Sequence, residues 1–115
     1  MQKTLLFFLS LSFFFLLNLY LISPIQAQTL NNLTGKEIFS INCAGCHPNG
    51  SNIIRRGKNL RLKTLQKNGY NSVEAIANII TNGKNNMSSF KDRLTEKEIN
   101  QVAKYVIEQA ENNWQ

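Results

Sequence analysis

The chain of 115 residues has few side chains that could bind a metal: two cysteines, one histidine and two methionines, one of them the initiator. A structural zinc site needs about four cysteine or histidine ligands. This chain has only three such residues, which excludes a structural zinc site. Both cysteines lie in Cys43-Ala44-Gly45-Cys46, and a disulfide across so short a loop removes little entropy from the unfolded chain. Thioredoxin-like chemistry uses this spacing in a βαβ unit, but no strand pattern surrounds Cys43.

The chain also lacks any useful run of alternating apolar and polar residues, which excludes half-buried strands. Helix signals are present instead. Thr34 with Glu37 and Thr95 with Glu98 form capping boxes, which predict two helices beginning at those points. The second of these helices carries one apolar stripe, formed by Ile99, Val102, Ala103, Val106 and Ala110. Residues 48–57, rich in Asn, Gly and Pro, predict a loop.

Two shorter helices are expected between these. Leucines among basic residues predict one over 58–67, ending near Gly69. The other is capped by Asn71 or Ser72 and stopped by Gly83. The sequence therefore predicts an all-α fold of about four helices in a single domain.

The first 27 residues differ in composition from the rest. Lys3 supplies a positive end, residues 5–22 are almost wholly apolar, and Pro24 and Ala27 resemble the approach to a cleavage point. The pattern predicts a signal peptide over 1–27 and an exported protein. An uncleaved membrane anchor is the alternative, because the apolar run is about as long as the shortest spanning segment. Residues 28–115 then form one small domain, of a size that commonly depends on a cofactor or cross-links.

The remaining interpretation of Cys43-Ala44-Gly45-Cys46-His47 is a c-type haem attachment site. One helical turn places the thiols of Cys43 and Cys46 to form thioethers with the two haem vinyl groups, and His47 can then bind the iron. Electron-transfer haems of this kind usually take a Met thioether as the other axial ligand. Met87, in the polar stretch KNNMSSF, is the candidate, although a methionine can also simply fill a gap in the core.

From Gly35 to Trp114 the chain resembles the cytochrome c6 family of class I cytochromes c. The matching stretches are GKEIFSINCAGCH, NSVEAI, TNGKNNM and RLTEKEINQVAKYVIEQAENNW, in that order. The resemblance implies a class I cytochrome c fold around one covalent haem, with the first and last helices of the domain crossing and Phe39 against Tyr105. It also implies Met87 as the distal ligand.

The resemblance further implies a one-electron carrier from the cytochrome b6f complex to photosystem I, or to a terminal oxidase. Such a protein makes and breaks no substrate bond, so it is not an enzyme. The expected location is the thylakoid lumen, or the periplasm, and the expected state is a monomer without stable membrane insertion after cleavage. Nucleic-acid binding is not expected of an exported haem protein, despite its positive charge.

Two positions depart from the family pattern. Ile79 stands where typical cytochromes c6 have a Gln close to the haem, and an aliphatic residue there is typical of the lower-potential branches named c6B and c6C. The alternative is that Ile79 only continues the apolar face of its helix. Ser88 stands where a Pro usually follows the ligand Met, which removes a constraint on the backbone. These departures favour a c6-like paralogue over the principal photosystem donor.

Acidic residues are lacking between Glu37 and Glu74, where six basic residues occur: Arg55, Arg56, Lys58, Arg61, Lys63 and Lys67. Such a run either steers the protein toward an acidic partner or is merely a solvated face.

A different class of function stays open as well. If Met87 does not bind the iron, the open site would suit a peroxidatic enzyme or a sensor of a diatomic ligand.

Overall fold

The computed structural model describes residues 1, 6, 8, 12–14 and 33–115. The prediction of a signal peptide over 1–27 therefore lies almost entirely outside the described residues. The chain divides into two units, Met1–Asn32 and Leu33–Gln115, and the second contains the features discussed below. Among the described residues, no helix is both long enough and apolar enough to cross a membrane.

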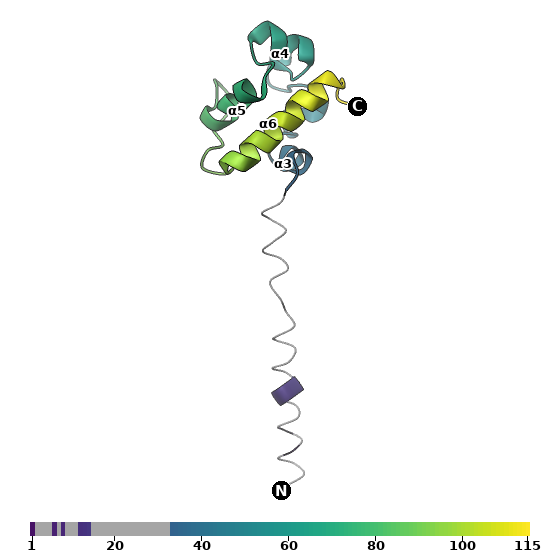
Figure 1. The fold of residues 1–115 in the computed structure, drawn as a ribbon, viewed down its shortest axis with the longest axis vertical. Helices are drawn as coiled ribbons and strands as arrows, with labels where there is room; N and C mark the ends of the chain where they lie inside the picture. Colours follow the sequence, from purple (N-terminus) through teal and green to yellow (C-terminus); the bar gives the residue numbers. More distant parts are fainter. Residues whose placement is uncertain (2–5, 7, 9–11, 15–32) are drawn as a thin grey trace. The chain divides into compact units, whose positions relative to one another are not determined.

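Between Leu33 and Gln115 the chain forms four α-helices and two 3-10 turns (Figure 1). The helices are α3 (Gly35–Asn42), α4 (Leu62–Asn68), α5 (Val73–Asn82) and α6 (Glu96–Glu111), and the 3-10 turns are η2 (Pro48–Gly50) and η3 (Arg56–Lys58). This part of the chain has no strand, only an isolated bridge between Lys84 and Met87. The prediction of an all-α fold is confirmed.

Both predicted capping boxes are formed. At the start of α3, the backbone N–H of Glu37 donates to Thr34 Oγ1 at 3.3 Å, and the Glu37 carboxylate accepts from the Thr34 N–H at 2.7 Å. Thr95 and Glu98 make the same pair of bonds at the start of α6, at 3.3 and 2.8 Å. Because each box satisfies backbone donors that the helix leaves free, both helices begin where the sequence predicts.

The predicted start of the α4 helix was wrong. Helix α4 begins at Leu62 and not at Lys58, because the side chain of Asn59 bonds locally to the backbone and interrupts the helix. Asn59 Nδ2 donates to the Arg56 carbonyl at 2.9 Å, and Asn59 Oδ1 accepts from the Arg61 N–H at 3.1 Å. Lys58, which was expected in the helix, belongs instead to the 3-10 turn η3.

The other helix limits agree with the predictions. Gly69 ends α4 with a left-handed φ of 73°, as a glycine at this position commonly does. Ser72 begins α5 by accepting a hydrogen bond from the Ala75 N–H at 3.2 Å, and Gly83 ends that helix. Ser72, and not Asn71, is therefore the capping residue.

Helices α3 and α6 cross closely, as the resemblance implies. A Cβ on Gly35 would lie only 2.4 Å from the carbonyl oxygen of Gln101, so the crossing requires a glycine. The rings of Phe39 and Tyr105 lie 5.5 Å apart between centroids, which confirms the expected contact. Trp114 completes this cluster at 5.1 Å from Phe39. The five members of the α6 apolar stripe are all buried.

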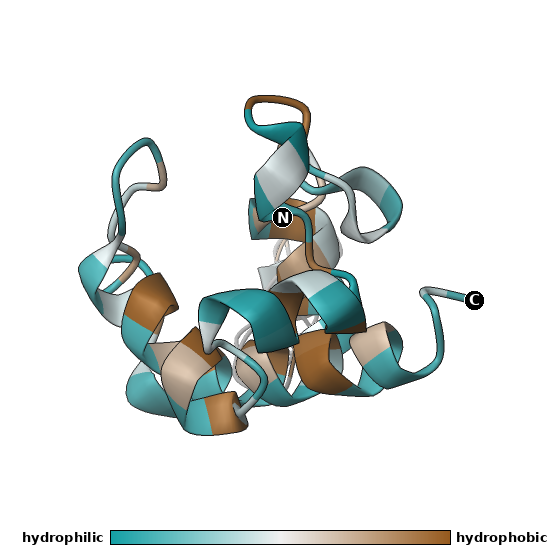
Figure 2. Ribbon diagram, turned by 90° about the horizontal axis from the view of Figure 1, so that it is seen from above, coloured by the Kyte–Doolittle hydropathy of each residue, from teal (hydrophilic) through white to brown (hydrophobic). Residues whose placement is uncertain are grey.

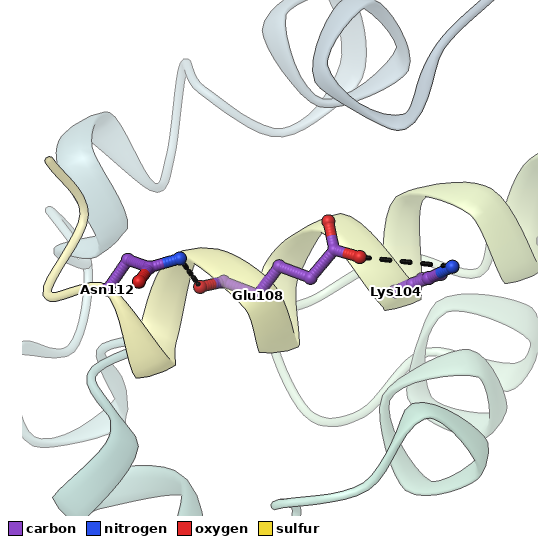
Figure 3. Close-up of polar contacts among 3 residues, drawn as sticks. All are labelled: Lys104, Glu108 and Asn112. Carbon is purple, nitrogen blue, oxygen red and sulfur yellow. Dashed lines mark hydrogen bonds and ion pairs between the residues drawn. The ribbon is translucent and has the colours of Figure 1, made fainter.

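The outward side of α6 is polar. Figure 3 shows Lys104, Glu108 and Asn112 at successive turns of the helix. The Lys104 ammonium lies 3.9 Å from the Glu108 carboxylate, and Asn112 Nδ2 donates to the Glu108 carbonyl at 2.9 Å. Because both charged side chains are exposed, the ion pair contributes little to stability, while the Asn112 bond satisfies a carbonyl at the helix end.

Candidate cofactor site

A cavity of about 370 Å³ lies among the end of α3, the segment after it, α5, the turn after α5, and α6. All five residues predicted for the site line it: Cys43, Cys46, His47, Ile79 and Met87. Its apolar wall includes Phe39, Leu60, Leu65, Ile76, Ile80, Phe90, Val102 and Val106. Four cationic side chains also line it, Arg55, Lys58, Lys84 and Arg93, and no acidic residue of the described chain does.

The two thiols lie on a turn that continues directly from α3. The N–H of Cys43 donates to the Phe39 carbonyl at 2.8 Å, and the N–H groups of Cys46 and His47 both donate to the Cys43 carbonyl, at 3.1 and 2.9 Å. The cysteines form no disulfide. Burial raises the pKa of the Cys43 thiol to about 11, with Arg93 opposing this effect and Cys46 adding to it. Before any thioether forms, the Cys43 thiol is therefore protonated at neutral pH.

The imidazole of His47 is oriented by a backbone carbonyl. His47 Nδ1 lies 2.9 Å from the Ser51 oxygen. Because a carbonyl can only accept, Nδ1 must carry the proton and Nε2 keeps a free lone pair. Burial lowers the pKa of His47, against the opposing effect of the Ser51 carbonyl. The ring is therefore a neutral imidazole whose Nε2 can bind a metal, and the carbonyl fixes its tautomer.

Met87 is held on a tight turn after α5. The Lys84 N–H donates to the Met87 carbonyl at 2.9 Å, and the Met87 N–H donates to the Lys84 carbonyl at 3.0 Å. Asn85, between them, has a left-handed φ of 53°, which asparagine tolerates better than most residues. Gly83 has a φ of 72°, and a Cβ there would lie 2.6 Å from the Met87 carbonyl oxygen. The turn thus depends on a glycine.

The chain after Met87 is tied back to α5. Ser89 Oγ donates to the Thr81 carbonyl at 2.5 Å, and the Phe90 N–H donates to the Ile80 carbonyl at 2.9 Å. Ser88 itself is exposed. The residue in the usual proline position therefore lies between two segments whose backbones are already fixed by hydrogen bonds.

Ile79 is half-buried and faces the cavity from α5, one turn before the helix ends. Its neighbours Ile76 and Ile80 are buried in the core and also reach the cavity wall. The aliphatic side chain of Ile79 has no hydrogen-bond donor to offer a bound molecule. At this position Ile79 presents only hydrocarbon to the cavity, whereas a glutamine would present the dipole of its amide.

Sequence reasoning missed how Asn52 shapes the loop bordering the cavity. Asn52 Oδ1 accepts from the N–H groups of Ile54 and Arg55, at 3.0 and 2.7 Å, and Asn52 Nδ2 donates to the Lys58 carbonyl at 3.1 Å. These bonds present Ile53 and Ile54 to solvent, with 65% and 57% of their surface exposed. Asparagine often makes such local bonds, so this residue type was a usable signal.

Sequence reasoning also missed the role of Trp114. Its Nε1 donates to the Leu60 carbonyl at 3.0 Å, and its ring covers Gly50, where a Cβ would lie 2.3 Å from the indole. Leu60 in turn lines the cavity. Because 54 positions separate Trp114 from Leu60, no local pattern in the sequence could have indicated this contact.

These features fit a haem. The cavity offers a neutral imidazole nitrogen and a thioether sulfur, the donor pair of electron-transfer cytochromes, together with two thiols spaced for covalent attachment. Apolar walls suit the porphyrin, and the cationic side chains suit its two propionates. The described residues contain no cluster of three or more His, Cys, Asp or Glu that could hold a separate metal ion.

Comparison with known proteins agrees with this fit. Residues 31–106 match the family model described as cytochrome c oxidase, cbb3-type, subunit III. A cytochrome c6-like protein of Nostoc sp. strain PCC 7120 is 62% identical over 98 residues, covering 84% of this chain and 88% of the relative.

Two solved structures superpose with TM-scores of 0.68. Cytochrome c6C from Synechococcus sp. PCC 7002 is 55% identical, covering 70% of this chain and 98% of that one. Cytochrome c6B from Synechococcus sp. WH8102 is 51% identical, covering 70% and 92%. The chain therefore belongs to the cytochrome c6 family, whose members are class I c-type cytochromes that carry electrons on a haem.

Proposed function

We propose that the chain, cleaved after Ala27, shuttles single electrons between the cytochrome b6f complex and photosystem I or a terminal oxidase. The proposed location is the thylakoid lumen or the periplasm. The observation that carries the proposal is the convergence of His47 and Met87 on the cavity that also contains Cys43 and Cys46. In this proposal Cys43 and Cys46 would attach the haem covalently, and His47 and Met87 would bind its iron.

The haem supplies the one-electron chemistry when it is bound, and the protein sets the conditions for it. His47 presents Nε2 because its Nδ1 donates to Ser51. The Met87 thioether would favour the reduced iron and would keep other ligands away. The apolar wall of the cavity excludes water, which further favours the form of lower charge. These properties suit a carrier and give no group for substrate chemistry.

Partners would dock at the loop that borders the cavity. Ile53 and Ile54 on this loop are exposed hydrophobic residues. Figure 2 shows that one projecting loop has a hydrophobic tip. Arg55 and Lys58 follow the two isoleucines in the chain, and both line the cavity. An apolar contact beside cationic side chains suits a partner whose surface carries acidic groups around a small apolar area. An electron would then pass between the haem and the docked partner without a conformational change in this protein.

The side chain of Ile79 supports a c6-like paralogue of lower potential over the principal photosystem donor. A polar group near a haem tunes its potential, and Ile79 offers none. We expect Ile79→Gln to raise the midpoint potential, because an amide dipole would then face the haem. Asn78→Gln is the matched control, since Asn78 is the exposed neighbour on α5 and does not line the cavity. An unchanged potential in Ile79→Gln would remove the basis for the low-potential assignment.

The test of the carrier function is redox titration of the mature holoprotein, followed by kinetics of electron donation to photosystem I. The oxidised protein should show the long-wavelength charge-transfer band of a methionine bound to iron. A missing band, together with ready binding of carbon monoxide by the reduced protein, would contradict the carrier proposal. It would favour the peroxidatic or ligand-sensing alternative, because the iron would then have an open position.

A further inference from the structure

The turn that carries Met87 is held by a side-chain contact as well as by its backbone. We propose that Tyr70 and Lys84 form a latch that slows the release of Met87 from the haem iron. The inference rests on the proposed ligation by Met87. It assigns a positioning role to two residues outside the ligand set.

The contact joins the turn to the connection between α4 and α5. Lys84 Nζ donates to the Tyr70 hydroxyl, and the same ammonium lies 5.0 Å from the centroid of the Tyr70 ring. These two positions place the ammonium beyond the hydroxyl at the edge of the ring, so it is not over the ring face. The lysine is therefore held by the hydroxyl of the tyrosine.

Tyr70 is the fixed member of the pair. Its N–H donates to the Leu65 carbonyl at 2.8 Å, directly after the left-handed Gly69 that ends α4. The ring is half-buried and packs against the hydrophobic core. A residue anchored through its backbone and its ring can restrain an exposed lysine that contacts it.

Lys84 transmits this restraint to Met87 through the backbone. The N–H and the carbonyl of each residue are bonded to the other, at 2.9 and 3.0 Å, so neither can move far alone. On the following side, Ser89 and Phe90 are tied to α5. The turn is thus attached to α5 on both sides of Met87, since the Gly83 N–H donates to the Ile79 carbonyl at 2.7 Å, and the Tyr70 contact adds an attachment to the α4–α5 connection. Breaking the Tyr70 contact removes this added attachment.

Other partners of Lys84 would act differently. No acidic residue of the described chain lines the cavity, and within residues 33–115 the structure gives Lys84 no ion pair. The remaining candidate is a haem propionate, which Lys84 could reach from the cavity wall. That contact would stabilise the haem through charge and would not need Tyr70. The two arrangements therefore differ in what substitution of the tyrosine does.

The experiment measures how fast Met87 leaves the iron in the ferric holoprotein. At saturating imidazole, the loss of the methionine-to-iron band is limited by methionine release. We expect Tyr70→Leu and Lys84→Met each to accelerate it about fivefold, the effect of losing one exposed hydrogen bond. The double variant should be no faster than either single variant, because both remove the same contact.

Two further variants sharpen the test. Tyr70→Phe keeps the ring and loses only the hydroxyl that Lys84 contacts, so it should accelerate release as much as Lys84→Met does. Lys63→Met removes an exposed lysine of α4 that does not line the cavity, and it should leave the rate unchanged.

Several outcomes would overturn the latch. Acceleration in Lys84→Met with a normal rate in Tyr70→Leu would assign the lysine to the propionate. Additive effects in the double variant would mean that the two residues act separately. A wild type that lacks the methionine-to-iron band would overturn the proposed ligation and the latch with it. A wild type that shows the band, with rates unchanged in every variant, would overturn the latch alone.

Discussion

Withholding the haem should unfold this domain, and the cavity volume gives the scale of the effect. A protein that kept this fold without the group would have to maintain a cavity of about 370 Å³. Large-to-small substitutions in a protein core cost about 24 cal/mol per Å³ of cavity left behind. The corresponding cost is at most about 9 kcal/mol, because this cavity is partly open to solvent. Domains are stable by only about 5–15 kcal/mol, so the loss is comparable to the whole stability.

The assay compares one sequence produced in two hosts, with and without the machinery that attaches haem to exported proteins. The product without haem should lack the far-ultraviolet circular dichroism of α3 to α6 and should melt without a cooperative transition. The variant Cys43→Ser/Cys46→Ser, produced in the host that attaches haem, should behave in the same way. Native helix content with cooperative melting in the haem-free chain would refute the reasoning, because the remaining core would then suffice.

Further predictions concern the packing around the site and are measured on the holoprotein by guanidinium unfolding followed by circular dichroism. Trp114→Phe should lose about 1 kcal/mol, since phenylalanine cannot donate to the Leu60 carbonyl, and an unchanged midpoint would contradict that role. Gly35→Ala should lose about 1–3 kcal/mol because its Cβ would meet a backbone carbonyl of α6, whereas a wild-type midpoint would mean that the helices can separate freely. Thr95→Ala should lose about 1 kcal/mol at pH 6 through its cap. Hydrogen bonds from Thr95 hold the pKa of Glu98 below its usual range, so this carboxylate stabilises the fold above its unfolded pKa near 4.3. The stabilisation is lost as pH falls through the lowered value, and the deficit of Thr95→Ala should shrink by pH 3; a constant deficit would count against the capping box.

The parts of the fold that the sequence predicted are those set by local bonds. Thr34 and Thr95 cap their helices through residues three positions away, and Ser72 does the same for α5. Gly69 and Gly83 end helices for a reason visible in the residue itself, since both adopt positive φ values. The prediction of where α4 begins was wrong because the Asn59 side chain bonds to the nearby backbone. Helix periodicity does not reveal such a competing local bond.

The parts that the sequence could not predict are non-local. Trp114 reaches Leu60 across 54 positions, and Tyr70 reaches Lys84 across 14, so neither contact leaves a repeating pattern. The candidate site residues could be named from the sequence for the opposite reason, and the structure places them around one cavity. The attachment motif is a run of five residues, and a chain with one spare methionine leaves Met87 as the candidate for the distal ligand.

The serine at position 88, where the family pattern has a proline, does not by itself loosen the turn that carries Met87. A proline restricts φ at its own position, but it has no backbone N–H to donate to the rest of the molecule. Here the turn is restrained on both sides of Ser88, by the paired backbone of Lys84 and Met87 before it and by the Ser89 hydroxyl after it. Most of the positional restraint on a side chain comes from such bonds, because they fix the backbone relative to α5. The difference from typical members is therefore expected more in the potential, through Ile79, than in how firmly Met87 is placed.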